Sequence, residues 1–330
     1  MLVTGHTGFK GAWLSLWLEQ LGARVFGLGL DQPHPGAAFH ALRPNLELDA
    51  RADIRDMSAI DSVFADADAD MVFHLAAQSL VLEGYRDPVG TYETNVLGTV
   101  NVLKASADRK VSAVIVVTTD KVYANAEEGA PFVESDPLGA HDPYSTSKAC
   151  ADLVSLGWKE EKTRVGIGRA GNVIGGGDMA PDRLLPDARR SALQGVPLVV
   201  RHPLSVRPWQ FVLEPLAGYL AYAEALLEGS GVPRALNFGP GSSDSWSVSR
   251  VVDTAFRLYG TGDWQVGSIA EAHEAGTLRI DSTLAKETLA WSPRLDVDAA
   301  IAHTVDWWRS EDAGEDLRAL ALTQLEQYST

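Results

Sequence analysis

A tyrosine and a lysine near the middle of the chain have the types and the spacing for proton transfer. Tyr144 and Lys148 are four residues apart, which places both on one face of a helix. An ammonium close to a tyrosine stabilises the tyrosinate and lowers the pKa of the tyrosine. Such a tyrosine can remove the proton of an alcohol while hydride leaves the same carbon atom. Pro143 suits the first position of that helix, so the pair predicts an alcohol-oxidising site.

A glycine-rich turn near Met1 predicts where the hydride acceptor binds. Gly5, Gly8 and Gly11 follow a short apolar run and precede a helix-like segment. Glycines there let the backbone approach a pyrophosphate, to which the helix N-terminus presents free N–H groups. Asp31 follows the second apolar run, where a carboxylate accepts hydrogen bonds from the adenosine ribose and repels a 2′-phosphate. The pattern therefore favours NAD over NADP.

Further cofactor contacts are expected where other strands end. Asp53 and Ile54 follow a strand-like stretch and could frame the adenine, and small Ala76 and Ala77 let the backbone pass close to the cofactor. The complete predicted NAD site is Gly5, Thr7, Gly8, Phe9, Lys10, Asp31, Asp53, Ile54, Leu75, Ala76, Ala77, Gln78, Asn95, Thr118, Tyr144 and Lys148.

The elements that must position these residues alternate along the first half of the chain. Buried strands are predicted at Leu2–Thr4, Arg24–Leu28, Met71–Leu75, Ala113–Thr118 and Val165–Arg169. Helices are predicted between them, including Ala12–Leu21, Val89–Ala107 and Tyr144–Gly157. This alternation predicts an α/β fold with a Rossmann-type, doubly wound parallel sheet. We expect residues 1–171 to bind NAD and residues 172–330 to form a smaller, mainly substrate-binding part, with some later segments returning to the sheet.

Composition narrows the class of protein. The 330 residues are 45% hydrophobic and 22% charged, which is enough for a large core. The formal net charge of −16 argues against a nucleic-acid partner or an anionic membrane. Cys150 is the single cysteine, which excludes an internal disulfide and fits a reducing compartment. With no run long enough to cross a membrane and no signal-peptide core, we predict a cytoplasmic protein without a metal site.

Several separate segments resemble one family, the extended short-chain dehydrogenases/reductases. They are TGHTGFKG from Thr4, TNVLGTVNVL from Thr94, TTDKVYAN from Thr118, ESDPLGAHDPYSTSKA from Glu134, RAGNVIGGGD from Arg169, RPWQFVLEPL from Arg207 and HEAGTLRID from His273. Together they are similar to the nucleotide-sugar 4,6-dehydratases, and most of all to those acting on CDP-glucose. In most of that branch Thr-Asp is followed by Glu, whereas Lys121 stands here, as in the enzymes specific for CDP-glucose.

The resemblance implies a catalytic role for each of these site residues. Oxidation at carbon 4 of the sugar is assigned to Tyr144, tuned by Lys148, with Thr119 hydrogen-bonded to the 4-oxygen. Asp120 is the acid at the departing 6-hydroxyl, and Lys121 is the candidate base at carbon 5. A lysine in water is protonated, so Lys121 needs desolvation or a nearby cation to act as a base. If it remains charged, it can instead stabilise the enolate.

The predicted substrate contacts come mainly from the second half of the chain. Guanidinium groups suit diphosphate oxygens, and Arg183 and Arg207 are the best candidates for that contact. A local group of cations would also explain how an acidic protein binds an anionic substrate. The predicted substrate-binding residues are Ser79, Asn172, Arg183, Arg207 and His273; Ser79 and Met179 stand where members of the branch often have proline and tryptophan.

Three other functions remain open at this point, the first of them a dehydratase that acts on another nucleotide sugar. A nucleotide-sugar 4-epimerase would use the same scaffold, although it needs no acid for a leaving hydroxyl such as Asp120. A non-catalytic, NAD-binding regulatory protein would not need Tyr144 and Lys148. The resemblance also implies a homodimer formed through the helices predicted at Val89–Ala107 and Tyr144–Gly157.

Overall fold

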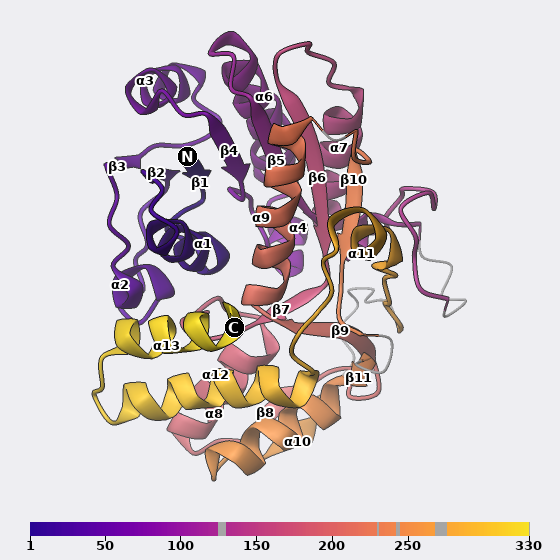
Figure 1. The fold of residues 1–330 in the computed structure, drawn as a ribbon. Coiled ribbons are helices and arrows are strands. Elements are labelled where there is room, and N and C mark those ends of the chain that lie inside the picture. The colour runs from indigo at the N-terminus through magenta and orange to yellow at the C-terminus, as the bar shows by residue number, and fades with distance from the viewer. Residues whose placement is uncertain (125–129, 230, 242–244, 268–275, 330) are drawn as a thin grey trace.

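A seven-stranded parallel sheet forms the centre of the molecule. The computed structural model describes residues 1–124, 130–229, 231–241, 245–267 and 276–329. The strands lie in the order β10-β6-β5-β4-β1-β2-β3 and every pair is parallel (Figure 1). Their bounds are β1 Leu2–Thr4, β2 Phe26–Gly29, β3 Leu48–Arg51, β4 Met71–His74, β5 Ala113–Thr119, β6 Arg164–Ala170 and β10 Ala235–Phe238. The predicted Rossmann-type fold is confirmed.

Helices cover both faces of this sheet because the strand side chains alternate between two apolar clusters. On β4, Phe73 joins the cluster that contains helix α1 (Phe9–Gln20) and helix α9 (Leu213–Glu228), whereas Val72 faces the opposite cluster. The opposite cluster contains α3 (Met57–Ala67) and α6 (Gly98–Asp108) and is flanked by α7 (Pro143–Gly157). Strands buried on both faces need apolar side chains at successive positions, which is why they read as continuous apolar runs.

The helix predicted at Val89–Ala107 is not one regular helix. Instead, α5 (Pro88–Tyr92) passes into a π-helical segment (Glu93–Leu97) before α6 begins. The widened turn contains Asn95, whose buried side chain donates from Nδ2 to the carbonyl of Gln78 at 2.9 Å and accepts from the amide of Gln78 at 2.8 Å. A polar side chain that must reach a neighbouring loop accounts for this local change of period.

The second half of the chain adds two small sheets and further helices beside the carboxyl ends of the central strands. One sheet has the order β11-β9-β7 and the other pairs β12 with β8. These elements are β7 Asn172–Ile174, β8 Leu198–Val200, β9 Val206–Phe211, β11 Ser245–Ser247, β12 Trp264–Val266, α8 Leu184–Gln194, α10 Val248–Tyr259, α11 Thr283–Leu289, α12 Val297–Asp312 and α13 Leu317–Ser329. None of the helices that the structure describes is long and apolar enough to span a bilayer.

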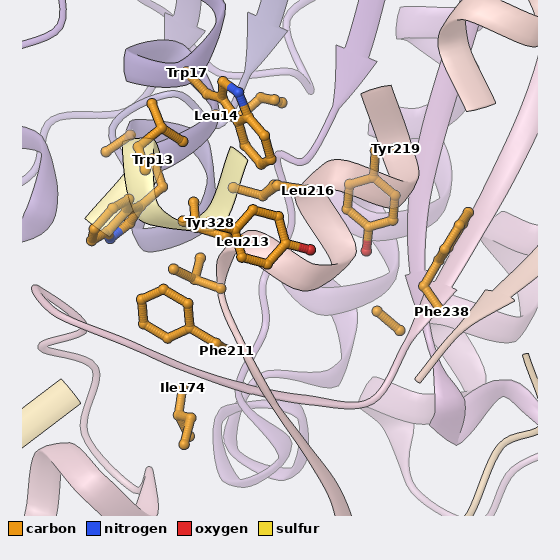
Figure 2. Packing of buried hydrophobic residues seen from close by; sticks show 14 of the residues in the cluster. Trp13, Leu14, Trp17, Ile174, Phe211, Leu213, Leu216, Tyr219, Phe238 and Tyr328 are labelled. Carbon is orange, nitrogen blue, oxygen red and sulfur yellow. The ribbon is translucent and has the colours of Figure 1, made fainter. Parts of the chain in front are cut away.

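The two halves of the chain share one apolar core. Trp13 of α1 contacts the ring of Trp307 on α12, with 5.8 Å between centroids, and Trp17 meets the ring of Tyr328 on α13 edge-on at 5.7 Å. Figure 2 shows the side chains of Trp13, Phe211 and Tyr328 gathered in this region. β10 is a strand of the central sheet and α9 packs against that sheet, so segments from both halves build this layer. The boundary predicted after residue 171 stays a prediction.

Candidate active site

A cavity of about 1260 Å³ lies at the carboxyl edge of the central sheet. The strand order reverses there, between β1 and β4. In doubly wound sheets this reversal leaves a crevice, because the chain leaves neighbouring strands in opposite directions. Of the predicted site residues, the lining includes Gly5, Thr7, Gly8, Phe9, Lys10, Asp53, Ile54, Leu75, Ala76, Ala77, Gln78, Ser79, Thr118, Thr119, Lys121, Tyr144, Lys148, Asn172, Arg183 and Arg207. Asp31, Asn95 and Asp120 do not line it, and His273 lies outside the described residues.

The turn after β1 has the shape needed for a dinucleotide. Gly5 has φ +74°, and a Cβ on it would lie 2.7 Å from the amide nitrogen of Ala76. The turn after β1 can therefore approach the backbone that follows β4 this closely only because this residue is glycine. Gly8 is the N-cap of α1, and no described side chain caps this helix. Its N-terminus is thus available to an anion at the cavity wall, which fits the pyrophosphate of NAD.

Asp31 does not line the cavity, although its neighbours Leu30 and Gln32 do, and its predicted contact with the ribose stays a prediction. The Asp31 side chain is 87% exposed and its Oδ1 lies 3.3 Å from Nε of Arg51, outside the cavity. β2 ends at Gly29, so the chain has already turned towards solvent two residues later. Gln32 and His34, which the sequence did not single out, line this part of the cavity instead.

Asp53 and Ile54 do lie at the cavity wall, after β3. Arg55 donates to both carboxylate oxygens of Asp53, and this hydrogen bonding lowers the pKa of Asp53. The carboxylate is therefore charged and fixed in orientation at neutral pH. Asn95, in contrast, does not line the cavity but holds the backbone of Gln78, which does, and its predicted cofactor contact stays a prediction.

Tyr144 and Lys148 enter the cavity from the first two turns of α7. Asp142 caps the helix by accepting from the amide of Ser145 at 2.9 Å, and Pro143 occupies the first turn. Burial raises the pKa of Tyr144 to about 12, while the Arg183 guanidinium and the Thr119 side chain act to lower it. Burial lowers the pKa of Lys148 to about 8, and its Nζ donates to the carbonyl of Val117 at 2.7 Å. Arg183 therefore acts to lower the pKa of Tyr144, which is the effect that the sequence assigned to Lys148.

The segment Thr119-Asp120-Lys121 continues from β5 into a single 3-10 turn. Thr119 donates from Oγ1 to Oδ1 of Asp120 at 2.9 Å and also caps the turn. Nζ of Lys121 lies 3.5 Å from Oδ1 of Asp120 and 3.5 Å from Oδ1 of Asn172. Asp120 is fully buried, and its Oδ2 has no hydrogen-bond partner within the described residues. The carboxyl group of Asp120 thus lies behind Thr119 and Lys121, which both line the cavity.

The opposite wall carries the predicted substrate residues. Arg183 donates from Nη2 to Oγ of Ser79 at 3.1 Å, and its Nη1 lies 3.8 Å from Oδ2 of Asp178. Arg207 is mostly buried and donates from Nη1 to the carbonyl of Val206 at 3.0 Å. Two guanidinium groups at one cavity can neutralise a diphosphate despite the acidic net charge of the chain.

Lys10 is a further titratable group of the cavity wall. Its Nζ lies 5.8 Å from the ring centroid of Tyr219, on α9. Burial, together with the Arg183 and Lys148 cations, lowers the pKa of Lys10 to about 7. The sequence predicted Lys10 only as part of the glycine turn, because its cationic neighbours are distant in the chain. The positive charges of Arg183 and Lys148 thus disfavour the charged form of Lys10 in the folded protein.

Comparison with known proteins identifies relatives over nearly the whole chain. The family model described as "NAD dependent epimerase/dehydratase family" matches residues 1–239. The CDP-glucose 4,6-dehydratase of Salmonella typhimurium strain LT2 is 40% identical over 342 aligned positions, covering 99% of this chain and 95% of the relative. A dTDP-glucose 4,6-dehydratase of Streptomyces antibioticus is 31% identical and covers 80% of this chain and 76% of its own.

Solved structures share the fold. The dTDP-glucose 4,6-dehydratase of Bacillus anthracis strain Ames, crystallised in complex with NAD, superposes with a TM-score of 0.81 at 23% identity. The match covers 95% of this chain and 97% of that one. The overall fold is therefore common to both molecules over nearly their whole lengths.

Proposed function

The chain belongs to the NAD dependent epimerase/dehydratase family, and from this premise we propose that it converts CDP-D-glucose into CDP-4-keto-6-deoxy-D-glucose and water. The 40% identical CDP-glucose 4,6-dehydratase of Salmonella typhimurium supports the nucleotide and the sugar. The reaction class is supported by the chain itself. One cavity joins an oxidising pair, Tyr144 and Lys148, to the acid–base segment Thr119-Asp120-Lys121.

The first step is oxidation of carbon 4 of the hexose. Bound NAD would accept the hydride from carbon 4 and return it to carbon 6 at the end of the cycle. Tyr144 takes the proton of the 4-hydroxyl, and Arg183, Thr119 and Lys148 are the groups placed to stabilise the tyrosinate. The product of this step is a ketone, which acidifies the neighbouring proton on carbon 5.

The second step removes water across carbons 5 and 6. Lys121 acts at carbon 5, either by taking the proton or by stabilising the enolate as an ammonium. Asp120 supplies the proton with which the 6-hydroxyl leaves as water. Because Asp120 does not line the cavity, we propose that this proton passes through Oγ1 of Thr119, which lies 2.9 Å from the carboxyl. Carbon 5 finally regains a proton as carbon 6 receives the hydride.

The protons of this cycle balance within the site. Tyr144 gains one proton per turnover and Asp120 loses one, while the proton removed from carbon 5 is replaced. Thr119 interacts with both side chains, so it provides a route by which the proton on Tyr144 restores Asp120. An epimerase would have no use for this route, since no hydroxyl leaves the sugar.

We propose that residues 172–330 mainly hold the nucleotide and the diphosphate. Arg183 and Arg207 are the proposed diphosphate ligands, with Asn172 and Ser79 nearer to the sugar. His273 remains a candidate ligand from sequence alone. We also propose a homodimer in the cytoplasm: Val89, Leu97 and Leu153 are exposed on α5, the π-helical segment and α7, and a single cysteine suits a reducing compartment.

The decisive experiment offers the purified protein CDP-glucose, dTDP-glucose and UDP-glucose separately with NAD. We expect a 4-keto-6-deoxy product from CDP-glucose, identified by nuclear magnetic resonance, and a far lower rate with the other two. The Tyr144→Phe variant serves as the inactive control. A 4-epimer without loss of water would replace the dehydratase by an epimerase, and absence of any product from the three sugars would refute the proposal.

A further inference from the structure

A buried ion pair lies directly behind the two catalytic segments. Arg169 of β6 and Asp152 of α7 are both fully buried and neither lines the cavity. Nε of Arg169 donates to Oδ2 of Asp152 at 2.8 Å, and Nη2 donates to Oδ1 at 2.7 Å. This two-pronged contact fixes the orientation of both side chains as well as their distance.

The pair is tied to both ends of the segment that carries Thr119, Asp120 and Lys121. Thr118, immediately before it, donates from Oγ1 to Oδ2 of Asp152 at 3.1 Å. Tyr123, just after it, accepts at its hydroxyl from Nη1 of Arg169 at 2.9 Å.

A further contact secures the far end of this segment. The Tyr123 hydroxyl in turn donates to Oδ1 of Asn237 on β10 at 2.6 Å. The acid–base segment is therefore held before its start through Thr118 and after its end through Tyr123, which is bonded to both β6 and β10.

The same pair is part of the helix that carries the oxidising residues. Asp152 follows Lys148 by four residues on α7, one turn further along, and Tyr144 by eight. Any displacement of Asp152 relative to Arg169 would move α7 against β5 and the turn after it. Two groups of side chains that must act on adjacent carbon atoms are thus joined through one contact.

Stability alone does not explain this choice of residues. Removing two charges from water is costly, and an apolar pair of similar volume often stabilises a core as well or better. What an apolar pair lacks is a directional contact that sets the spacing of two elements. Catalytic groups need their productive geometry within a fraction of an ångström, and displacements of about 1 Å can cost a hundredfold in rate.

We propose that Arg169 and Asp152 are positioning residues that hold Thr119, Asp120 and Lys121 in register with Tyr144 and Lys148, so that water is eliminated before the oxidised sugar leaves. The proposal rests on the dehydratase function proposed above. Its specific consequence concerns the order of events in one turnover. When the contact is lost, the sugar is still oxidised at carbon 4, but the elimination of water across carbons 5 and 6 becomes slower.

The test compares an apolar replacement of the whole pair with single changes. The Arg169→Met/Asp152→Leu double variant removes the directional contact without leaving an unpaired charge. The Arg169→Lys variant keeps the positive charge but loses the two-pronged contact. We expect the double variant to unfold near the wild-type temperature and to keep its KM for CDP-glucose and its affinity for NAD, measured by calorimetry. We expect its kcat to fall about tenfold or more. The 4-keto sugar that retains its 6-hydroxyl, or the reduced cofactor, should accumulate.

Arg189→Met is the matched control. Arg189 is also a buried arginine paired with acidic residues, Glu311 and Asp312 of α12, but it does not line the cavity. The Arg189→Met variant should lower the unfolding temperature without changing how much of the 4-keto sugar with its 6-hydroxyl is released.

Three outcomes would overturn the proposal. Recovery of wild-type kcat in the stable double variant would do so, as would a loss of activity that only follows the amount of folded protein. If neither the double variant nor Arg169→Lys folds, the pair serves folding and not positioning. Absence of dehydration by the wild-type protein would instead refute the proposed function.

Discussion

Arg183 joins the two walls of the cavity through a 3.1 Å hydrogen bond from its Nη2 to Oγ of Ser79. The two residues come from opposite halves of the chain, and the contact places a guanidinium beside Tyr144. This guanidinium opposes the effect of burial on the pKa of Tyr144. Arg183 thus acts electrostatically on Tyr144, an effect that the sequence, which predicted only a diphosphate contact for Arg183, did not indicate.

Replacing Arg183 with Gln should move the pH dependence of the reaction. A tyrosine acts as a base only when deprotonated, so kcat rises with pH through its pKa in the complex. Without the guanidinium that pKa is higher, and the rising limb of the kcat–pH profile should shift to higher pH. KM for the substrate should also increase. Arg257→Gln, at an exposed position of α10, is the control for loss of one positive charge. An unshifted profile with only a raised KM would restrict Arg183 to binding.

Replacing Thr119 with Val should distinguish the contribution of its hydroxyl to activity from the contribution of its packing. Valine preserves the branched side chain but leaves Oδ1 of Asp120 without its 2.9 Å donor and interrupts the proposed proton route. We expect kcat to fall by about a hundredfold, in the range of lost general acid–base catalysis. The Thr119→Ser variant retains the hydroxyl and should keep most of the activity. Equal loss in both variants, measured by product formation, would argue for packing and against proton transfer.

Replacing Lys121 with Met should stop the chemistry at carbon 5. We expect oxidation at carbon 4 to continue, so that reduced cofactor appears, while dehydration falls by about two orders of magnitude or more. In deuterium oxide, the wild-type product should carry deuterium at carbon 5. Lys104→Met, on the exposed face of α6, controls for charge. Near-normal dehydration by Lys121→Met would remove this lysine from the mechanism.

Replacing Lys10 with Met should stabilise the free protein most at low pH. The pKa of Lys10 falls to about 7 in the folded protein, mainly through burial, whereas an unfolded lysine titrates at about 10.5. The folded state therefore binds fewer protons between these values, and this lysine destabilises the protein fully below pH 7 and not above about pH 10.5. The gain in free energy of unfolding of Lys10→Met should shrink as the pH rises through this window. Urea unfolding at pH 6.5 and at pH 9.5 measures it; a constant difference would contradict the lowered pKa.

Charges on the exposed apolar faces of two helices should change the oligomeric state. Leu97 and Leu153 are exposed large apolar side chains on the π-helical segment and α7. If these faces pair two copies, Leu97→Asp and Leu153→Asp place carboxylates in a buried contact and should yield monomers in analytical ultracentrifugation. Leu193→Asp, an exposed leucine on α8, is the control. A wild-type protein that sediments as a monomer would remove the dimer proposal.

The sequence predicted the first half of the fold well because its signals are local. Each strand that is buried on both faces is an apolar run, and Gly5, Pro143 and the Tyr144–Lys148 spacing mark turns and helix starts directly. The limits of Ala113–Thr118 were correct to one residue. The sequence did not show that Asp31 lies on an exposed loop, because the point where a loop leaves the cavity depends on contacts made after folding.

The second half was predicted only in outline, since its elements depend on partners distant in the chain. Helix α9 presents apolar residues to the central sheet, and β10 pairs with β6, more than 60 residues earlier. The role of Arg183 beside Tyr144 and the contact between Arg169 and Asp152 likewise arise only after folding. Residue types indicated which chemistry was available, whereas three-dimensional proximity determined which groups act together.

The late position of β10 in the chain has a consequence for protein synthesis. Until residue 238 has left the ribosome, the nascent chain has β6 as an unpaired edge. A nascent chain of 171 residues already contains the glycine turn after β1 and the predicted acid–base residues. It also exposes the apolar sheet face that α9 later covers. Unpaired edges and exposed apolar surface promote aggregation. We therefore expect residues 1–171, expressed by themselves, to yield insoluble protein.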